Sequence, residues 1–132
     1  MKKLILVLFV AFTLQACSEK TTGISVQNSK WLLSEWPGQT LPSVRSATLN
    51  FDTANKVSGK SFCNGFGGEA IIKGNSVKFD QLLGTMMFCE DVGNAEKNYL
   101  DGLKATTSFK IVDNKLQLYK DATLLMVFTK TD

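Results

Sequence analysis

Residues 61–70 read SFCNGFGGEA, a cysteine and an asparagine followed by three glycines around a phenylalanine. The glycines follow the pattern G-x-G-G, not the G-x-G-x-x-G of a dinucleotide-binding loop, and no Walker lysine and serine come after them. No helix is expected directly after the stretch, so no helix N-terminus is available to hold a phosphate. The stretch is therefore interpreted as a structural bend between two strands.

Each residue type in this bend has a structural reason. Asn64 and Gly65 tolerate positive φ and allow the chain to turn. Phe66 is expected in the core. The pair Gly67-Gly68 permits a β-bulge or a close approach of another backbone.

The chain begins with a segment typical of a bacterial lipoprotein signal. Lys2 and Lys3 precede an apolar run over residues 4–14, which covers about 16 Å as a helix and is too short to span a bilayer. Residues 14–17 read Leu-Gln-Ala-Cys, as in signals that are cut before a cysteine whose thiol then carries lipid. The alternative is an ordinary secretory signal followed by a chance cysteine.

We therefore predict three parts of the chain: a signal peptide at residues 1–16, the lipidation site Cys17 with a flexible tether at residues 17–29, and one domain at residues 30–132. Acyl chains contribute about 0.8 kcal/mol per buried CH₂, so several chains on one cysteine would hold the protein to a membrane. The expected location is the bacterial cell envelope, at the outer membrane and facing the periplasm, and Ser18 after the lipid cysteine is compatible with that membrane.

Cys63 and Cys89 remain as an even pair in an oxidising compartment, which favours a disulfide. In the chain-entropy description, a bridge closing a loop of this length stabilises the fold by about 3.5 kcal/mol. The alternative is a copper(I) site, because Met86 and Met87 are soft ligands close to Cys89. Packing in a core explains the same residue types, so we predict a disulfide, no metal and no cofactor.

The composition argues against an enzyme and against nucleic-acid binding. The chain has no histidine, which removes the commonest general base and the Ser-His-Asp and Cys-His arrangements. The adjacent Glu90 and Asp91 are explained by the positive end of a helix dipole. Loss of Lys2 and Lys3 with the signal lowers the formal net charge from +3 to about +1, and the remaining charges form no basic cluster.

The rest of the chain alternates short strand patterns with turn residues, which is typical of a small antiparallel sheet or barrel. In residues 47–51 every second side chain is apolar, so one face of that strand is expected in the core. Further strands are expected over residues 30–36, 57–61, 68–73, 75–82, 109–111, 116–118 and 124–129, the last covered on both faces. Turns are expected at Gly74-Asn75, Asp113-Asn114 and Asp121-Ala122.

Two segments between residues 82 and 106 differ from this pattern. Residues 82–89, LLGTMMFC, are mostly apolar and are expected to be buried. Residues 91–106 are the only helical candidate, with Asp91 or Asn94 as its cap and an apolar stripe at helical spacing. That stripe consists of Tyr99, Leu100 and Leu103.

The order and spacing of five motifs resemble the META (HslJ-like) domain family. The motifs are Trp31-Leu32-Leu33, Leu49-Asn50-Phe51, Val57-Ser58-Gly59, Cys63-Asn64-Gly65-Phe66-Gly67-Gly68 and Thr85-Met86-Met87-Phe88-Cys89. The resemblance covers about residues 30–129 and implies a mainly β fold, an antiparallel, barrel-like sheet with one packed helix. It also implies structural roles for the motif residues Trp31, Gly59, Asn64, Phe66, Gly68 and Thr85. Ala70 and Phe88 depart from the usual family residues, and we hypothesise that they exchange bulk in the core.

The resemblance supplies no catalytic residue, and it implies an association with heat stress, novobiocin tolerance, motility or virulence in relatives. We expect a non-enzymatic, membrane-anchored envelope lipoprotein, a monomeric binding or interaction module related to stress or antibiotic tolerance. Its expected partners are the membrane, through the lipid, and an envelope protein. The alternatives are a carrier of a small apolar ligand in the barrel interior and an inhibitor of an envelope hydrolase.

Overall fold

The computed structural model describes residues 26–131. The expected signal peptide, the lipidation site Cys17 and the first part of the tether lie outside the described residues. Within residues 26–131, no helix is long and apolar enough to cross a bilayer.

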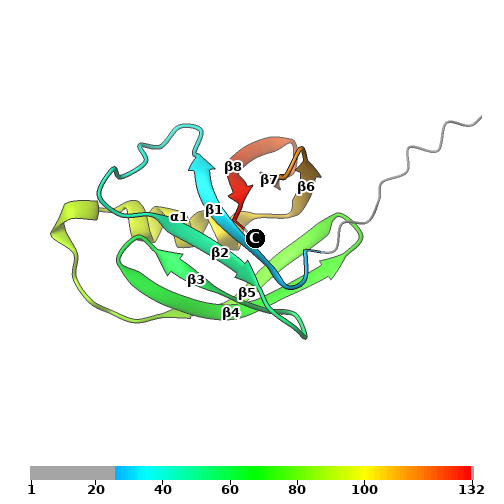
Figure 1. Ribbon diagram of the computed structural model, residues 1–132, viewed down its shortest axis with the longest axis horizontal. Helices are drawn as coiled ribbons and strands as arrows, with labels where there is room; N and C mark the ends of the chain where they lie inside the picture. The colour runs from blue at the N-terminus through cyan, green and yellow to red at the C-terminus, as the bar shows by residue number, and fades with distance from the viewer. Residues whose placement is uncertain (1–25, 132) are drawn as a thin grey trace, which may run out of the picture.

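Eight antiparallel strands close into a barrel in the order of the chain, and β8 returns to pair with β1 (Figure 1). The strands are β1 (Ser29–Glu35), β2 (Ala47–Phe51), β3 (Lys56–Ser61), β4 (Asn64–Lys73), β5 (Ser76–Gly84), β6 (Ser108–Val112), β7 (Lys115–Lys120) and β8 (Thr123–Lys130). Between β5 and β6 lie a 3₁₀ turn, η1 (Glu90–Val92), and the helix α1 (Ala95–Ala105). The predicted class, mainly β with an antiparallel barrel-like sheet and one packed helix, is confirmed.

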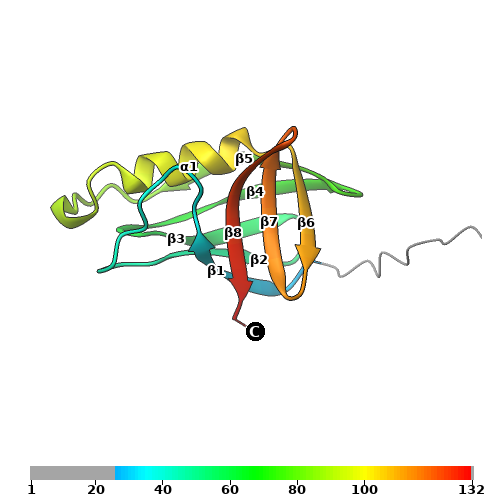
Figure 2. The ribbon, with the colours of Figure 1, turned by 90° about the horizontal axis from the view of Figure 1, so that it is seen from above.

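The barrel is uneven, because β5 and β6 are joined at a single residue pair, Ser76 and Ser108. Two backbone hydrogen bonds, Val77 N to Thr107 O and Phe109 N to Asn75 O, support this short junction. Helix α1 contacts β5 and β3 and runs alongside β5, as Figure 2 shows. The helix therefore covers the side of the barrel where the strand pairing is weakest.

Tyr99 of α1 fixes the helix to the barrel. Its ring is fully buried among the aromatic rings of Phe62, Phe66 and Phe128, with centroids 5.9, 5.9 and 6.3 Å away. Its hydroxyl donates a hydrogen bond of 2.8 Å to the backbone oxygen of Thr48 in β2. Burial raises the pKa of Tyr99 well above its usual value, because the charged phenolate is poorly solvated there.

The alternating patterns place the expected side chains in this core. Ala47, Leu49 and Phe51 are buried in β2, and Val77 and Phe79 are buried in β5. The turns also follow the expectation, since Gly74, Asp113, Asn114 and Asp121 all have positive φ. In β8 three consecutive residues, Met126, Val127 and Phe128, are buried, as expected for a covered strand.

The ordered domain begins earlier than Lys30. Val26 and Ser29, which the sequence placed in the tether, are both buried. The indole N–H of Trp31 donates to the Ser29 hydroxyl at 2.7 Å, and that hydroxyl donates to the backbone oxygen of Val26. A buried indole N–H needs an acceptor, so Trp31 holds this segment against the barrel.

The positive φ expected at Asn64 and Gly65 lies instead at Phe62, with φ of 70°. A left-handed conformation costs a residue other than glycine about 1–2 kcal/mol. Phe62 offsets this cost through its ring, which is fully buried and stacks on Trp36 at a centroid distance of 5.7 Å. The bend therefore turns one residue before Cys63, not after it.

The strand β4 carries the close approach expected at Gly67-Gly68. A Cβ on Gly68 would lie 2.8 Å from the backbone oxygen of Asp80 and 2.7 Å from Leu82 Cδ2. The register between β4 and β5 shifts at this point, so a β-bulge is present. The extra residue belongs to β5, where Gln81 has φ of 52°.

Candidate functional site

The segment joining β5 to η1 is exposed, not buried. We call residues 85–89 the arm. Met86 is 96% exposed and Phe88 is 90% exposed, and Leu83 just before the arm is 78% exposed. The expected burial of residues 82–89 is therefore wrong. The proposed exchange of bulk between Ala70 and Phe88 is also wrong, because Ala70 is buried and Phe88 faces solvent.

The arm is nevertheless fixed to the barrel at one end by a disulfide. Cys63 and Cys89 are bonded to each other, with Cα atoms 5.8 Å apart, so the predicted disulfide is confirmed. Both sulfurs are used in this bond, which leaves the alternative copper(I) site only Met86 and Met87. No group of three or more His, Cys, Asp or Glu residues suited to a metal occurs among residues 26–131.

Asn64 holds the middle of the arm. Asn64 is only 2% exposed. Its Oδ1 accepts hydrogen bonds of 2.8 Å from the backbone N–H of Met87 and from the hydroxyl of Thr85. Its Nδ2 donates to the backbone oxygen of Met87 at 2.9 Å. The backbone N–H of Thr85 donates to Gly65 O at 3.0 Å. Residues 85, 87 and 89 are thus tied to the barrel.

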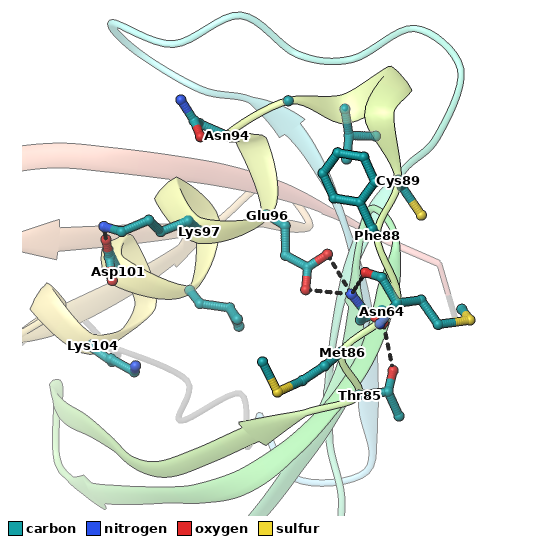
Figure 3. A pocket seen from close by; sticks show the side chains of 14 residues that line it. Asn64, Thr85, Met86, Phe88, Cys89, Asn94, Glu96, Lys97, Asp101 and Lys104 are labelled. Carbon is teal, nitrogen blue, oxygen red and sulfur yellow. Dashed lines mark hydrogen bonds and ion pairs between the residues drawn. The ribbon is translucent and has the colours of Figure 1, made fainter.

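The same amide also reaches helix α1. Asn64 Nδ2 lies 2.8 and 2.9 Å from the two carboxylate oxygens of Glu96. Figure 3 shows Asn64 between the arm and the helix, with Glu96 above it. Sequence reasoning placed Asn64 in the bend but missed its partner Glu96, and the residue pattern of the helix gave no signal for it.

A groove of about 590 Å³ runs between the arm and α1. Asn64 lies in its lining, the arm forms one side, and α1 forms the other with Glu96, Lys97, Leu100, Asp101 and Lys104. In Figure 3 the labelled side chains of Met86 and Glu96 lie on opposite sides of this groove. The groove combines exposed apolar groups with a few charges, which is the usual chemistry of a binding surface.

The charges along the helix side are unevenly paired. Lys97 Nζ lies 2.6 Å from Asp101 Oδ2 and donates the hydrogen bond that lowers the pKa of Asp101. The positive charge of Lys104 acts on the same carboxyl group. Glu96 forms no ion pair within residues 26–131, and its hydrogen bonds come from one neutral amide.

A second hollow of about 600 Å³ lies at the same end of the barrel. It is formed by the connection between β1 and β2, and it includes the exposed Val44. Arg45 in this connection forms an ion pair of 2.9 Å with Asp91 of η1. This ion pair joins the connection between β1 and β2 to η1, which follows the arm. The exposed Val44 therefore lies at the same end of the molecule as the exposed apolar side chains of the arm.

The structure brings together some of the motif residues and separates others. Asn64 and Thr85 meet at the arm beside the Cys63–Cys89 disulfide. Trp31, Gly59, Phe66 and Gly68 instead lie in the barrel wall or its core. A Cβ on Gly59 would lie 2.2 Å from Thr48 O and 2.9 Å from the Phe66 ring, so this position has room only for glycine.

These features define a class of small, closed β-barrel proteins with one helix and a disulfide-held loop at one end. The family model of the META domain matches residues 24–132. The chain belongs to the META domain family.

Solved structures show the same fold. The chain is similar to a protein from Burkholderia xenovorans determined by NMR, with 26% identity, a TM-score of 0.71, and coverage of 80% of this chain and 83% of the other. It shares its fold with a DUF4847 family protein from Bacteroides vulgatus determined by crystallography, with 10% identity, a TM-score of 0.61, and coverage of 84% and 99%. No curated protein sequence matches the chain significantly.

Proposed function

We propose that this META domain protein is a lipid-anchored binding module of the bacterial envelope and not an enzyme. Its binding surface is the arm together with the groove beside α1, and its partner is another envelope protein. The expected role in stress or antibiotic tolerance follows from the family resemblance and belongs to this proposal.

The exposure of the arm is the observation that carries the proposal. Monomeric proteins rarely expose large contiguous groups of apolar side chains, and such groups mark interaction sites. Here a disulfide and the four hydrogen bonds of Asn64 and Thr85 hold Met86 and Phe88 in an exposed position. A segment fixed in this way loses little conformational entropy when a partner binds.

The position of the arm suits a protein tethered by its N-terminus. Strand β1 begins beside the end of β8, where Thr131 N donates to Lys30 O. The arm lies at the other end of the barrel, as Figure 1 shows for the connection from β5 to α1. Lipid on Cys17 would therefore hold the opposite end of the domain near the membrane and leave the arm directed into the periplasm.

The barrel interior argues against the alternative of a ligand carrier. The largest fully buried side chains, Trp31, Tyr99, Phe62 and Phe128, fill the space where an apolar ligand would have to bind. Nothing in residues 26–131 marks a reactive loop of an enzyme inhibitor. A chain without histidine also lacks the commonest catalytic base, which supports a binding role.

The anchor is tested by the intact mass of the protein extracted from membranes. We expect cleavage before Cys17, a mass increase from acyl chains, and a further two-hydrogen change when reductant opens the disulfide. The C17S variant should lack the acyl mass and leave the membrane fraction. An unmodified Cys17 in membrane-extracted protein would contradict the anchor.

The binding role is tested by a photo-crosslinking amino acid at position 88 in intact cells. Position 112, an exposed apolar residue at the end of β6, serves as the control. We expect one envelope protein to crosslink from position 88 and not from position 112. The purified partner should then bind the lipidated protein in nanodiscs at least tenfold more weakly after the M86S/F88S double substitution. Equal crosslinking from both positions would remove the arm from the proposal.

A further inference from the structure

We propose that the groove binds an extended polypeptide segment of the partner. Apolar side chains of this segment contact Met86 and Phe88, and one of its basic side chains pairs with Glu96. This inference rests on the proposed function and specifies the chemistry of the partner. It is argued from the backbone of the arm, from the charges of the groove and from the position of both in the molecule.

The backbone of the arm favours an extended chain over a compact ligand. Thr85 and Met87 direct backbone groups toward β4, where Gly65 and Asn64 pair with them. In an extended segment the residues between them direct their N–H and C=O groups to the opposite edge. Within the described chain, the backbone groups of Met86 and Phe88 have no hydrogen-bond partner.

Such an edge can accept one more strand. Main-chain hydrogen bonds supply affinity in this mode of recognition, and every second side chain of the added strand supplies specificity. A strand laid along the arm would pair with Met86 and Phe88 and place alternate side chains over the groove. Those side chains would meet the exposed apolar groups of the arm and the side chains of α1.

The charge of the groove specifies the basic residue. Two lysines and two carboxylates line its helix side, and the positive charges of both lysines are attracted to the carboxylate of Asp101. Glu96 is the carboxylate without a cation, and its two oxygens accept hydrogen bonds only from Asn64. A carboxylate offers about four acceptor sites, so Glu96 can still accept hydrogen bonds from a lysine or arginine of the partner.

A second copy of this chain and the lipid surface fit these features less well. Residues 81–91, which include the arm, contain no lysine or arginine, so a second arm could not supply the cation for Glu96. The membrane that would hold Cys17 is expected at the opposite end of the domain from the arm. A separate, extended segment with basic and apolar residues is therefore the occupant that satisfies both the edge and the charge.

The test is a selection of random twelve-residue peptides displayed on phage against the lipidated protein in nanodiscs, after removal of binders to empty nanodiscs. We expect enriched peptides to carry apolar residues at every second position and a lysine or arginine at a fixed distance from them. The E96Q variant keeps an oxygen that can accept from Asn64, so it should fold. It should bind a selected peptide at least tenfold more weakly, whereas D113N, in the exposed turn after β6 and outside the groove, should change affinity less than twofold.

Backbone pairing has its own measurement. N-methylation removes one amide donor of the selected peptide at a time, and we expect loss of binding only at alternate positions, those facing Met86 and Phe88. Uniform tolerance of N-methylation, or equal binding to wild type and E96Q, would overturn the inference. The proposed function would survive that result if M86S/F88S still abolished binding.

Three further outcomes separate the proposals. Peptides that bind M86S/F88S as tightly as wild type would overturn the proposed function together with this inference. Concentration-dependent dimers that M86S/F88S abolishes, without any enriched peptide, would assign the surface to a second copy. Binding of the C17S protein to vesicles of phosphatidylglycerol through the arm would assign it to lipid.

Discussion

Asn64 shows how a single side chain can join three parts of a small fold. Its carbonyl oxygen accepts two hydrogen bonds from the arm, and its amide donates to the arm and to Glu96 of α1. Only an amide side chain combines donors and acceptors in this way. Aspartate has nearly the same shape but only accepts when ionised.

The N64D substitution should therefore destabilise the protein by about 2–4 kcal/mol at neutral pH. The variant loses its donors to Met87 O and Glu96 and buries a second carboxylate beside Glu96. Urea unfolding followed by tryptophan fluorescence measures the change. N98D on α1 is the control, because the side chain of Asn98 makes one exposed hydrogen bond of 3.3 Å to Gln39. Equal losses in the two variants would remove Asn64 as the joining residue.

Tyr99 should make stability depend on pH in the alkaline range. Its pKa is raised in the folded state by burial, so the folded protein keeps the phenol proton after the unfolded chain has lost it. The contribution of Tyr99 is thus complete below the unfolded pKa of about 10 and falls by about 1.4 kcal/mol per pH unit above it. Y99F lacks this titration and lacks the bond to Thr48, which is worth about 1 kcal/mol.

Urea unfolding of wild type and Y99F at pH 8 and pH 11 isolates this effect from the titration of lysines, which both proteins share. Wild type should be more stable than Y99F by about 1 kcal/mol at pH 8. This difference should vanish or reverse at pH 11. A constant difference between the two proteins across this range would show that Tyr99 does not hold its proton in the fold.

At the scale of elements, local pattern predicted most strands because alternation directly reports which face is buried. Residues 47–51 and 77–80 alternate in sequence and also in burial. The arm was wrongly predicted because apolar composition does not say whether a segment packs in the core or against a partner. The turn at Phe62 was missed for a related reason, since only tertiary packing of its ring makes positive φ acceptable there.

The start of the helix shows a limit of cap residues as signals. Residues 91–106 were predicted as one helix, but Gly93, with φ of 54°, separates η1 from α1. Asn94 is the N-cap of α1, although its side chain makes no capping hydrogen bond. The interaction of Glu96 with Asn64 joins residues far apart in sequence, and a single sequence carries no signal of such a pair.

The packing of β2, β3 and β4 predicts very different losses of stability when two glycines, Gly59 and Gly65, are replaced by alanine. G59A should destabilise the barrel by about 3 kcal/mol or more, because its Cβ would lie 2.2 Å from the backbone oxygen of Thr48, which cannot move without distorting β2. G65A should change stability by less than about 1 kcal/mol, because the nearest atom is 3.8 Å away. Thermal unfolding should show a drop of at least 10 °C for G59A alone, at about 4–8 °C per kcal/mol.

Removal of the disulfide should loosen the arm and lower global stability. The C63A/C89A variant should lose about 3.5 kcal/mol through the greater entropy of its unfolded chain. The backbone N–H of Met87 donates a hydrogen bond to Asn64 Oδ1. Its hydrogen exchange should accelerate more than exchange in β7. Unchanged protection of Met87 would mean that Asn64 alone fixes the arm.

At the scale of the whole molecule, the barrel separates the end where β1 begins from the end that carries the arm. Strand β1 begins next to the end of β8, and the arm, the connection between β1 and β2 and the start of α1 gather at the other end (Figures 1 and 2). Strand β5 has nine residues, which correspond to about 30 Å.

This geometry predicts a gradient of accessibility along the anchored protein. In lipidated protein on vesicles, acetylation of Lys115 and Lys130 should be slower than in the soluble C17S variant, because both lie at the end where β1 begins. Lys60 and Lys97, at the arm end, should react at the same rate in both forms, which makes them internal controls. Mass spectrometry of isotope-coded acetyl groups gives the four rates in one sample. Protection of Lys97 instead of Lys130 would place the arm on the membrane, and the partner of the groove would then have to be lipid.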